Sequence, residues 1–371
     1  MKERLVLEDI PINTQVAILA FVLGALFGVT AQRTNFCTMG ALSDVVFIGD
    51  WNRLRAWMLA VAVATLASQG LELFEAVDLN ASIYRSVNLG WLGAIIGGLM
   101  FGFGMTLAGG CANKTLVRLG GGNLKSFVVA VVLGIFAYMT LRGLIGLARV
   151  ELQEVSMIDV SGWGAANQGL PELLAVLGAP LGAARIILTA MVAGALVWFC
   201  FKDAGFRRSP QDVAAGLIVG LLVAVAWAVT GIVGADDFEP VPLTSMTFVA
   251  PIGEGLQYLM TFTGSTINFG IAAVGGIVAG AFLSALARKQ FHIESFTDAN
   301  DMLRHLVGAA LMGTGGVMAL GCTVGQGITG MSTLSLGSLI AVVAIIIGGL
   351  LGLKYQEEGN FADALRALIW R

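Results

Sequence analysis

Charged side chains are scarce in this sequence. Lys, Arg, Asp and Glu make up 12% of the 371 residues, whereas about 25% is usual for a soluble domain. So few charges cannot solvate the surface of a soluble domain of this length, which excludes that class. The net charge of −3 is too small to indicate a nucleic-acid partner, and none is expected.

Histidine and cysteine are also few, which limits metal and redox chemistry. The two histidines, His292 and His305, cannot form a multi-histidine metal site by themselves. None of the four cysteines belongs to a CxxC pair, so neither a zinc site nor a thioredoxin-like motif is indicated. We therefore expect no metal, no cofactor and no catalytic residue, and the sequence does not predict an enzyme.

Apolar residues dominate the chain instead. They make up 57% of it, and the mean hydropathy is +0.85. Several apolar runs approach 20 residues, about the length that lets a helix cross a hydrocarbon core of roughly 30 Å. The sequence predicts an all-α, polytopic integral membrane protein, surrounded by lipid, with one transmembrane domain over residues 1–371. About nine spans are predicted, at approximately 15–33, 56–73, 89–110, 126–148, 184–201, 212–234, 266–287, 303–320 and 336–353.

Basic residues are distributed unevenly between the two ends of these spans. Fifteen lie on one side and five on the other, and Arg142, placed inside a span, completes the 21. Cytoplasmic loops carry the excess of Lys and Arg, so we expect the N-terminus outside and the C-terminus in the cytoplasm. Arg142 would either neutralise an anion or extend to the membrane interface. The five residues on the outer side are Lys2, Arg4, Arg85, Arg149 and Arg185.

An internal repeat surrounds two of the cysteines. In the segments GGLMFGFGMTLAGGC, ending at Cys111, and GAALMGTGGVMALGC, ending at Cys322, matching residues recur at a constant offset of 211. They include Gly102, Gly104, Ala108, Gly110 and Cys111, which match Gly313, Gly315, Ala319, Gly321 and Cys322. The matching spans are five apart, and an odd separation gives them opposite orientations, as in the inverted repeats of many secondary transporters. We expect repeat 1 at about 15–148, repeat 2 at about 212–353 and a connecting region at about 149–211. A duplication retained only for packing is the alternative.

Uncharged polar loops interrupt the apolar runs at these two cysteines. Residues 306–353 carry no charge, yet 321–335 reads GCTVGQGITGMSTLS, which is loop composition. The preceding 306–320 would rise only about 22 Å as a helix, less than the hydrocarbon thickness. Cys322 is therefore predicted within the bilayer in a re-entrant segment, with the Cys111 loop as its counterpart. Irregular backbone at that depth must contact protein or a watery cavity.

Such broken helices can bind an anion. Free backbone N–H groups and the positive end of a helix dipole favour negative charge, and glycine lets the backbone approach a ligand closely. Close packing, loop solvation or helix capping is the alternative role for each nearby residue. The candidate contacts beside the cysteines are Gly110, Gly321, Asn113, Lys114, Thr323 and Gln326.

Three cysteines are candidates for contact with a soft, polarizable cargo. Cys111 and Cys322 share a repeat position, and Cys37 ends the first span in the polar sequence QRTNFCTMGA. Cys200, in VWFCF, is typical of a small packing residue. Neutral thiols would donate S–H contacts to an anion without repelling it. Copper(I), the other soft cargo, prefers Met together with Cys, and no MxxM or MxxxM cluster lies beside these cysteines.

At these residues the sequence resembles the YeeE/YedE family of sulphur-compound transporters. The resemblance covers essentially the whole chain, and its loop motifs are NFCTMGA, AGGCANKT and ALGCTVGQG. It implies a transporter of the bacterial inner membrane that imports thiosulfate through a central path. In that path Cys37, Cys111 and Cys322 would hand the anion along by S–H···S hydrogen bonds. A separate soluble TusA-like sulfurtransferase is a partner that the resemblance allows.

The order of the thiols and the cargo are further expectations with alternatives. From the topology, Cys322 is expected outermost, with Cys37 and Cys111 deeper or toward the cytoplasm. Related branches are associated with selenium metabolism, so another sulphur or selenium species is one alternative cargo. A membrane sulfurtransferase that forms a cysteine persulfide is an alternative of another class. This reaction needs an activated thiolate. No histidine or acidic residue neighbours any of the three thiols in the sequence, and Lys114 is the only activating group close to one of them.

Overall fold

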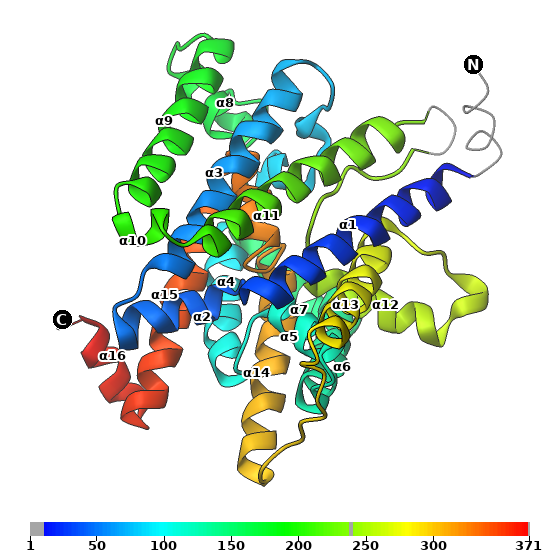
Figure 1. Cartoon of the computed structure of the whole chain (residues 1–371). Coiled ribbons are helices and arrows are strands. Elements are labelled where there is room, and N and C mark those ends of the chain that lie inside the picture. Colours follow the sequence, from blue (N-terminus) through cyan, green and yellow to red (C-terminus); the bar gives the residue numbers. More distant parts are fainter. Residues whose placement is uncertain (1–10, 237–239, 370–371) are drawn as a thin grey trace.

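The computed structural model describes residues 11–236 and 240–369, and these residues are mostly helical (Figure 1). Eight helical segments among them are long and apolar enough to cross a membrane. The prediction of an all-α polytopic membrane protein is thereby confirmed. Lys2, Arg4 and Arg371, which contributed to the predicted orientation, lie outside the described residues.

Helices of the N-terminal half follow the first predicted spans closely. The connection from α3 to α4 contains two short 3-10 turns, η3 (Leu79–Ala81) and η4 (Ile83–Arg85). The helices are α1 (Ile12–Thr34), α2 (Thr38–Ser43), the π-helical turn η2 (Asp44–Ile48), α3 (Asn52–Leu73), α4 (Trp91–Leu107), α5 (Ala112–Gly120) and α6 (Leu124–Arg142).

The connecting region holds one further long helix and several short elements. Strand β1 (Asn88–Leu89) pairs antiparallel with β2 (Ile158–Asp159), which fastens this region to the loop before α4. The other elements are α7 (Leu144–Ser156), η5 (Val160–Trp163), α8 (Leu170–Val176), α9 (Leu181–Phe201) and α10 (Ala204–Arg207).

The C-terminal half repeats the alternation of long helices and short helical turns. Its elements are α11 (Pro210–Ala228), the π-helical turn η6 (Val229–Val233), α12 (Val249–Met260), η7 (Phe262–Gly264), α13 (Phe269–Ala287), α14 (Ala299–Met318), the π-helical turn η8 (Gly325–Gly330), α15 (Leu336–Glu358) and α16 (Phe361–Ile369).

Three details of the predicted spans differ from the structure. The span 126–148 is wrong, because extended backbone at Gly143 ends α6 and a new helix follows. Arg142 is consequently an exposed helix end and not a residue inside a span. The connector 235–265 contains α12, which was not predicted. The span 303–320 forms α14, which is not among the eight apolar helices since its first turns are polar.

The long helices pack in reciprocal pairs between the two halves of the chain. α1 lies against α13 while α11 lies against α3, and α4 lies against α15 while α14 lies against α6. Glycines make these contacts close, because a Cβ at Gly24 or Gly276 would collide with the backbone of the partner helix in the first pair. Gly216 does the same in the α11–α3 pair. Such an exchange is what two intertwined repeats would produce; the inverted relation between them stays a prediction.

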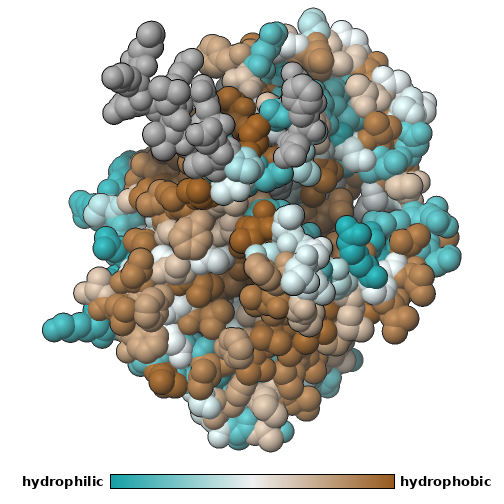
Figure 2. All heavy atoms as spheres, turned by 90° about the vertical axis from the view of Figure 1, so that its right-hand side faces the viewer, coloured by the Kyte–Doolittle hydropathy of each residue, from teal (hydrophilic) through white to brown (hydrophobic). Residues whose placement is uncertain are grey.

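The surface is largely apolar. Figure 2 shows hydrophobic side chains over much of the visible face, with hydrophilic ones gathered mainly toward its edges. On α9, Ile187 and Trp198 are exposed, as expected for lipid contact. Lys202, just after α9, lies 5.0 Å from the centre of the Trp198 ring. An aromatic ring beside a cation is typical of the membrane interface, so α9 ends there.

Candidate functional site

Cys37 lies at the turn between α1 and α2. Asn35 takes a left-handed conformation with φ of 55°, which ends α1 and turns the chain back. Cys37 follows as the N-cap of α2 and is only 5% exposed. Arg53 fixes this turn from α3, because its guanidinium donates to the Asn35 carbonyl at 2.8 Å and pairs with Asp44 at 2.9 Å.

Cys111 lies at the turn between α4 and α5 and meets Cys37. Gly109, with φ of +67°, allows the turn, and Cys111 then caps α5. The two Sγ atoms are 3.6 Å apart, close enough for an S–H···S contact. The Cys111 thiol also lies 2.6 Å from Oδ1 of Asn113, to which it donates. Two segments that are 74 residues apart in the chain therefore bring a pair of buried thiols together.

Cys322 occupies the equivalent turn after α14. Leu320 is left-handed with φ of 57°, and Gly321 has φ of +159°. The fully buried Cys322 follows, and its Sγ accepts a hydrogen bond from the Gly325 N–H at 3.4 Å. The whole stretch from Gly321 to Gly330 is buried. Irregular backbone is thus enclosed by protein, as a re-entrant segment within the bilayer would require.

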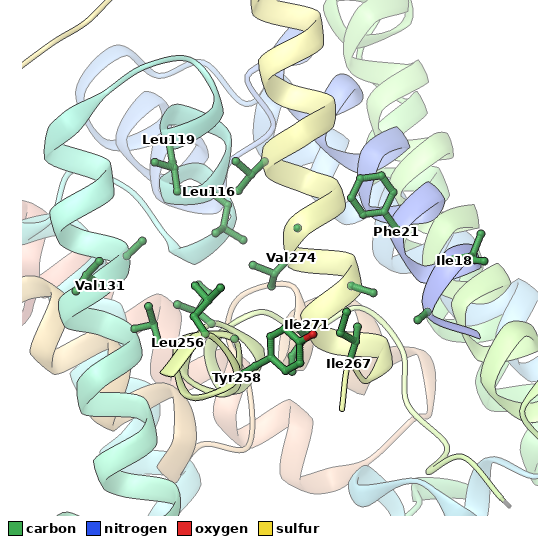
Figure 3. A pocket seen from close by; sticks show the side chains of 18 of the residues that line it. Ile18, Phe21, Leu116, Leu119, Val131, Leu256, Tyr258, Ile267, Ile271 and Val274 are labelled. Atoms are coloured by element: carbon green, nitrogen blue, oxygen red, sulfur yellow. The ribbon is translucent and has the colours of Figure 1, made fainter. Parts of the chain in front are cut away.

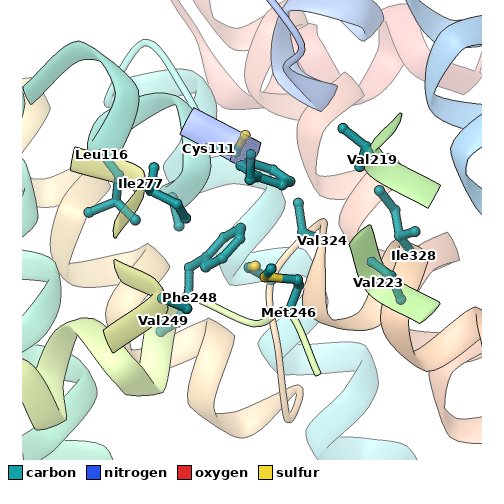
Figure 4. Packing of buried hydrophobic residues seen from close by; sticks show 14 of the residues in the cluster. Cys111, Leu116, Val219, Val223, Met246, Phe248, Val249, Ile277, Val324 and Ile328 are labelled. Atoms are coloured by element: carbon teal, nitrogen blue, oxygen red, sulfur yellow. The ribbon is translucent and has the colours of Figure 1, made fainter. Parts of the chain in front are cut away.

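One hydrophobic cluster contains all three thiols. Thr323, the residue after Cys322, lies beside Cys111 and links the two repeated loops. Figure 4 shows Cys111 facing the same packed region as Met246, Phe248 and Val324. All three thiols are therefore enclosed by protein, and Cys37 and Cys111 are in direct contact.

Aromatic rings help to enclose the thiols. Phe27 of α1 meets Phe248, the N-cap of α12, edge to face with ring centroids 5.2 Å apart. The Phe248 backbone also lies beside the Cys322 thiol. Both phenylalanines are fully buried.

Cys200 lies apart from the other thiols. It belongs to a separate small cluster with Ala56, Leu59 and Phe206. Its Sγ donates to the Arg55 carbonyl at 3.2 Å. This position agrees with the packing role that its sequence context indicates.

The polar residues that the sequence predicts as ligand contacts lie near the cysteines, and some of them form hydrogen bonds within the protein. Lys114 donates to Oδ1 of Asn35 at 2.7 Å, across from α5 to the turn before Cys37. The Gln326 amide donates to the Ala319 carbonyl, which braces the Cys322 loop. Asn113 and Thr323 are almost fully buried. The remaining predicted contacts, Gly110 and Gly321, are buried directly before Cys111 and Cys322.

A cavity of about 390 Å³ with a partly polar lining reaches the Cys322 loop. Its lining includes Gln326 from that loop, Ser335 and Ser338 at the start of α15, and Tyr84 and Gln168 from the connections. Apart from Gln326, these residues were not singled out in the sequence. Ser335 and Ser338 stand in or beside the uncharged loop that was, whereas no local pattern marks Tyr84 or Gln168.

A buried ion-pair cluster supports the far end of the same loop. Arg85, whose side chain is fully buried, pairs with Glu72 at 2.5 Å, and Arg185 pairs with Glu172 at 2.8 Å. Arg85 Nε also donates to the Thr333 carbonyl at 2.9 Å. The cluster was missed in the sequence because its members come from four separate elements. It neutralises its own charge and holds the backbone after η8.

Basic groups surround the Cys37–Cys111 pair on its other flank. Arg118 donates to the Gly109 carbonyl at 2.8 Å, in the turn before Cys111. Lys114 and Arg53 reach Asn35, in the turn before Cys37. Asp44 is the carboxylate that pairs with Arg53 here. The region therefore has an excess of positive charge that would attract an anion.

A second cavity, of about 670 Å³, has a different character (Figure 3). It is lined almost entirely by apolar side chains of α1, α5, α6, α12 and α13, among them Phe21, Leu116 and Ile271. An apolar cavity of this kind suits a hydrocarbon chain and offers nothing to bind a small anion. It is therefore not a candidate for the ion site.

Comparison with known proteins decides the family. Residues 33–351 match the family described as Sulphur transport. The chain belongs to this family. The resemblance to YeeE/YedE proteins is thereby confirmed, and the protein is a sulphur-compound transporter.

Relatives of this sulphur transporter cover most of its length. The Thiosulfate transporter TsuA of Escherichia coli (strain K12) is 25% identical over 347 residues, which is 88% of this chain and 91% of the relative. The Thiosulfate transporter TsuA of Spirochaeta thermophila is 27% identical over 333 residues, 88% of this chain and 95% of the relative. The Probable transporter YedE of Escherichia coli (strain K12) is 32% identical over 102 residues, 27% of this chain and 23% of the relative. Family and relatives are transporters rather than enzymes.

Proposed function

We propose that this sulphur transporter imports thiosulfate across the bacterial inner (cytoplasmic) membrane, with its N-terminus outside and its C-terminus in the cytoplasm. The observation that carries the proposal is the gathering of Cys37, Cys111 and Cys322 in one buried cluster. Thiols are soft and polarizable, and they suit the terminal sulphur of thiosulfate better than they suit an oxygen. The two relatives named as thiosulfate transporters support this choice of cargo.

The path begins at the cavity beside the Cys322 loop. In the proposed orientation this cavity faces the outside, because the connection between α3 and α4 that lines it lies on the outer side. Gln326 extends from the cavity into the loop, four residues after Cys322. Thiosulfate would enter here, and Cys322 would be the first thiol to contact it.

The Cys37–Cys111 pair forms the inner part of the path. Thiosulfate would exchange the S–H contact of Cys322 for those of Cys111 and Cys37, which already lie 3.6 Å apart. Each exchange replaces one weak hydrogen bond by another, so no single site binds too tightly for release. Lys114, Arg53 and Arg118 then attract the dianion toward the cytoplasm. A soluble TusA-like sulfurtransferase would be a suitable acceptor at this exit.

Uptake by cysteine variants tests this path. Cells without other thiosulfate importers would be given radiolabelled thiosulfate, with wild type compared to Cys37→Ser, Cys111→Ser and Cys322→Ser at matched membrane levels. We expect each variant to lose most uptake, because serine keeps the size but not the soft sulphur. Cys200→Ser is the matched control and should transport normally.

The outcomes separate the mechanism from the cargo. Normal uptake by all three variants would show that the thiols only pack. No uptake by wild type would instead reject thiosulfate, and another sulphur or selenium species would become the leading cargo.

A further inference from the structure

Several buried polar groups around the thiols have no hydrogen-bond partner. A buried donor without a partner costs free energy of roughly 1–3 kcal/mol, so such groups are few in folded proteins. Within the described residues they include the indole N–H of Trp57, the hydroxyl of Thr323 and the amide nitrogen of Asn113. These side chains are 8%, 2% and 1% exposed, respectively. All three groups can donate a hydrogen bond, and none carries charge.

Trp57 connects the two cysteine-bearing regions. A Cβ at Gly327, in η8, would lie about 3.5 Å from Cε2 of Trp57, the ring atom that carries the indole nitrogen. One turn earlier on α3, Arg53 contacts the turn that precedes Cys37. The unpartnered N–H therefore lies on the helix that spans from the Cys37 turn to the Cys322 loop.

Thr323 and Asn113 both lie close to the Cys111 thiol. Thr323 follows Cys322 directly, and its hydroxyl lies near the Cys111 thiol without forming a hydrogen bond of normal geometry. Asn113 accepts the Cys111 S–H through Oδ1, which leaves its amide nitrogen free to donate to another group. Two unpartnered donors are thus found close to Cys111, one of them on the residue that follows Cys322.

We infer that Trp57, Thr323 and Asn113 form a neutral oxyanion-binding site between the outer thiol and the inner thiol pair. The inference rests on the proposed function and assigns the sulphur and the oxygen atoms of thiosulfate to two different kinds of contact. The thiols take the terminal sulphur, and these three donors take the sulfonate oxygens. Neutral donors bind an anion without adding a charge that would hold it in place, which suits a site that the ion must leave.

Binding to purified protein tests this site apart from transport. Radiolabelled thiosulfate would be titrated against wild type, Trp57→Phe and Thr323→Val in detergent. Thr323→Val keeps the shape of the side chain and removes the donor, whereas Trp57→Phe removes the indole N–H together with part of the ring. Loss of one hydrogen bond to a charged oxygen should weaken binding roughly tenfold. Thr323→Ser restores a hydroxyl and should bind nearly as wild type does.

Thr189→Val provides the matched control. Thr189 on α9 also carries a buried hydroxyl without a partner, but it lies with Arg185 and Ile186 beside another cavity. Its substitution should leave thiosulfate binding unchanged. Thr323→Val and Thr189→Val remove an unpartnered polar group without opening a cavity, so their melting temperatures should stay the same or rise. Trp57→Phe should lower the melting temperature, because the smaller ring leaves a cavity.

The outcomes distinguish this site from the transport proposal. Wild-type affinity in Thr323→Val, measured on protein with an unchanged melting temperature, would overturn the inference. Absence of thiosulfate binding to wild type would overturn it as well. Binding that depends on these donors, in a protein that moves no thiosulfate in cells, would support the site and reject import.

Discussion

At the scale of single residues, the thiols are placed by unusual backbone conformations. Asn35, Gly109 and Leu320 each take a left-handed conformation shortly before a cysteine. Each ends a helix there and lets the chain turn, so that the cysteine begins the next helical element or loop. The sequence indicates this pattern at Cys111 and Cys322 through the repeated Gly-Cys step.

Gly109→Ala tests whether this backbone conformation matters for transport. Its φ of +67° disfavours any side chain, yet an added Cβ would have no contact shorter than 3.7 Å. The cost is therefore conformational, about 1–2 kcal/mol. We expect a lower melting temperature and several-fold slower thiosulfate uptake, because relief of the strain would move Cys111.

Gly49→Ala is the control for that substitution. Gly49 has a similar φ of +74° with nothing within 4 Å of the added Cβ, and it follows the η2 turn. It should lose similar stability but keep normal uptake. Normal uptake by Gly109→Ala as well as by Gly49→Ala would show that the conformation of the Cys111 turn has no role in transport.

Some residues of the site could be predicted from the sequence and others could not. Cys111 and Cys322 were found because duplication repeats them, and Cys37 because its helix end is polar. Trp57 could not be found, since a tryptophan in an apolar span is ordinary and only the structure shows that its N–H has no partner. Tyr84 and Gln168 reach the cavity beside the Cys322 loop through tertiary folding alone.

At the scale of elements, the lengths of the apolar runs in the sequence predicted the long helices well and the short elements poorly. Hydropathy gave no signal for the break at Gly143, because apolar residues continue on both sides of Arg142 and Gly143. It also missed α12, whose 12 residues are too few to cross a bilayer. Both errors concern backbone that is stabilised by neighbouring helices rather than by its own composition.

The buried ion pairs show how the connecting region is fixed to the helices. Arg85→Met would leave Glu72 and Glu172 buried with less compensation, and should lower the free energy of unfolding by about 3–5 kcal/mol. The melting temperature of purified protein measures this change. Arg366→Met is the control, because Arg366 pairs with Asp363 on the surface and is 79% exposed there. Such a pair contributes about 0–1 kcal/mol. Equal melting temperatures would contradict a stabilising role for the cluster.

At the scale of the whole molecule, the arrangement joins two halves around the thiols. α4 and α14, which precede Cys111 and Cys322, lie against each other. Gly104 and Gly308 are part of that contact, and a Cβ on either would meet the backbone of the other helix. The two repeated cysteines therefore follow directly after two helices that pack tightly against each other. The composition of the sequence predicted a membrane protein, whereas the packing of α4 against α14 could be seen only in the structure.

Transport by the purified protein is the most direct test of the account. Wild type and Cys322→Ser would be reconstituted separately into liposomes, and the entry of radiolabelled thiosulfate would be timed against empty liposomes. We predict rapid entry with wild type and a rate close to that of empty liposomes with Cys322→Ser. Equal entry with wild type, Cys322→Ser and empty liposomes, from protein shown to be folded, would contradict thiosulfate transport through the thiol centre.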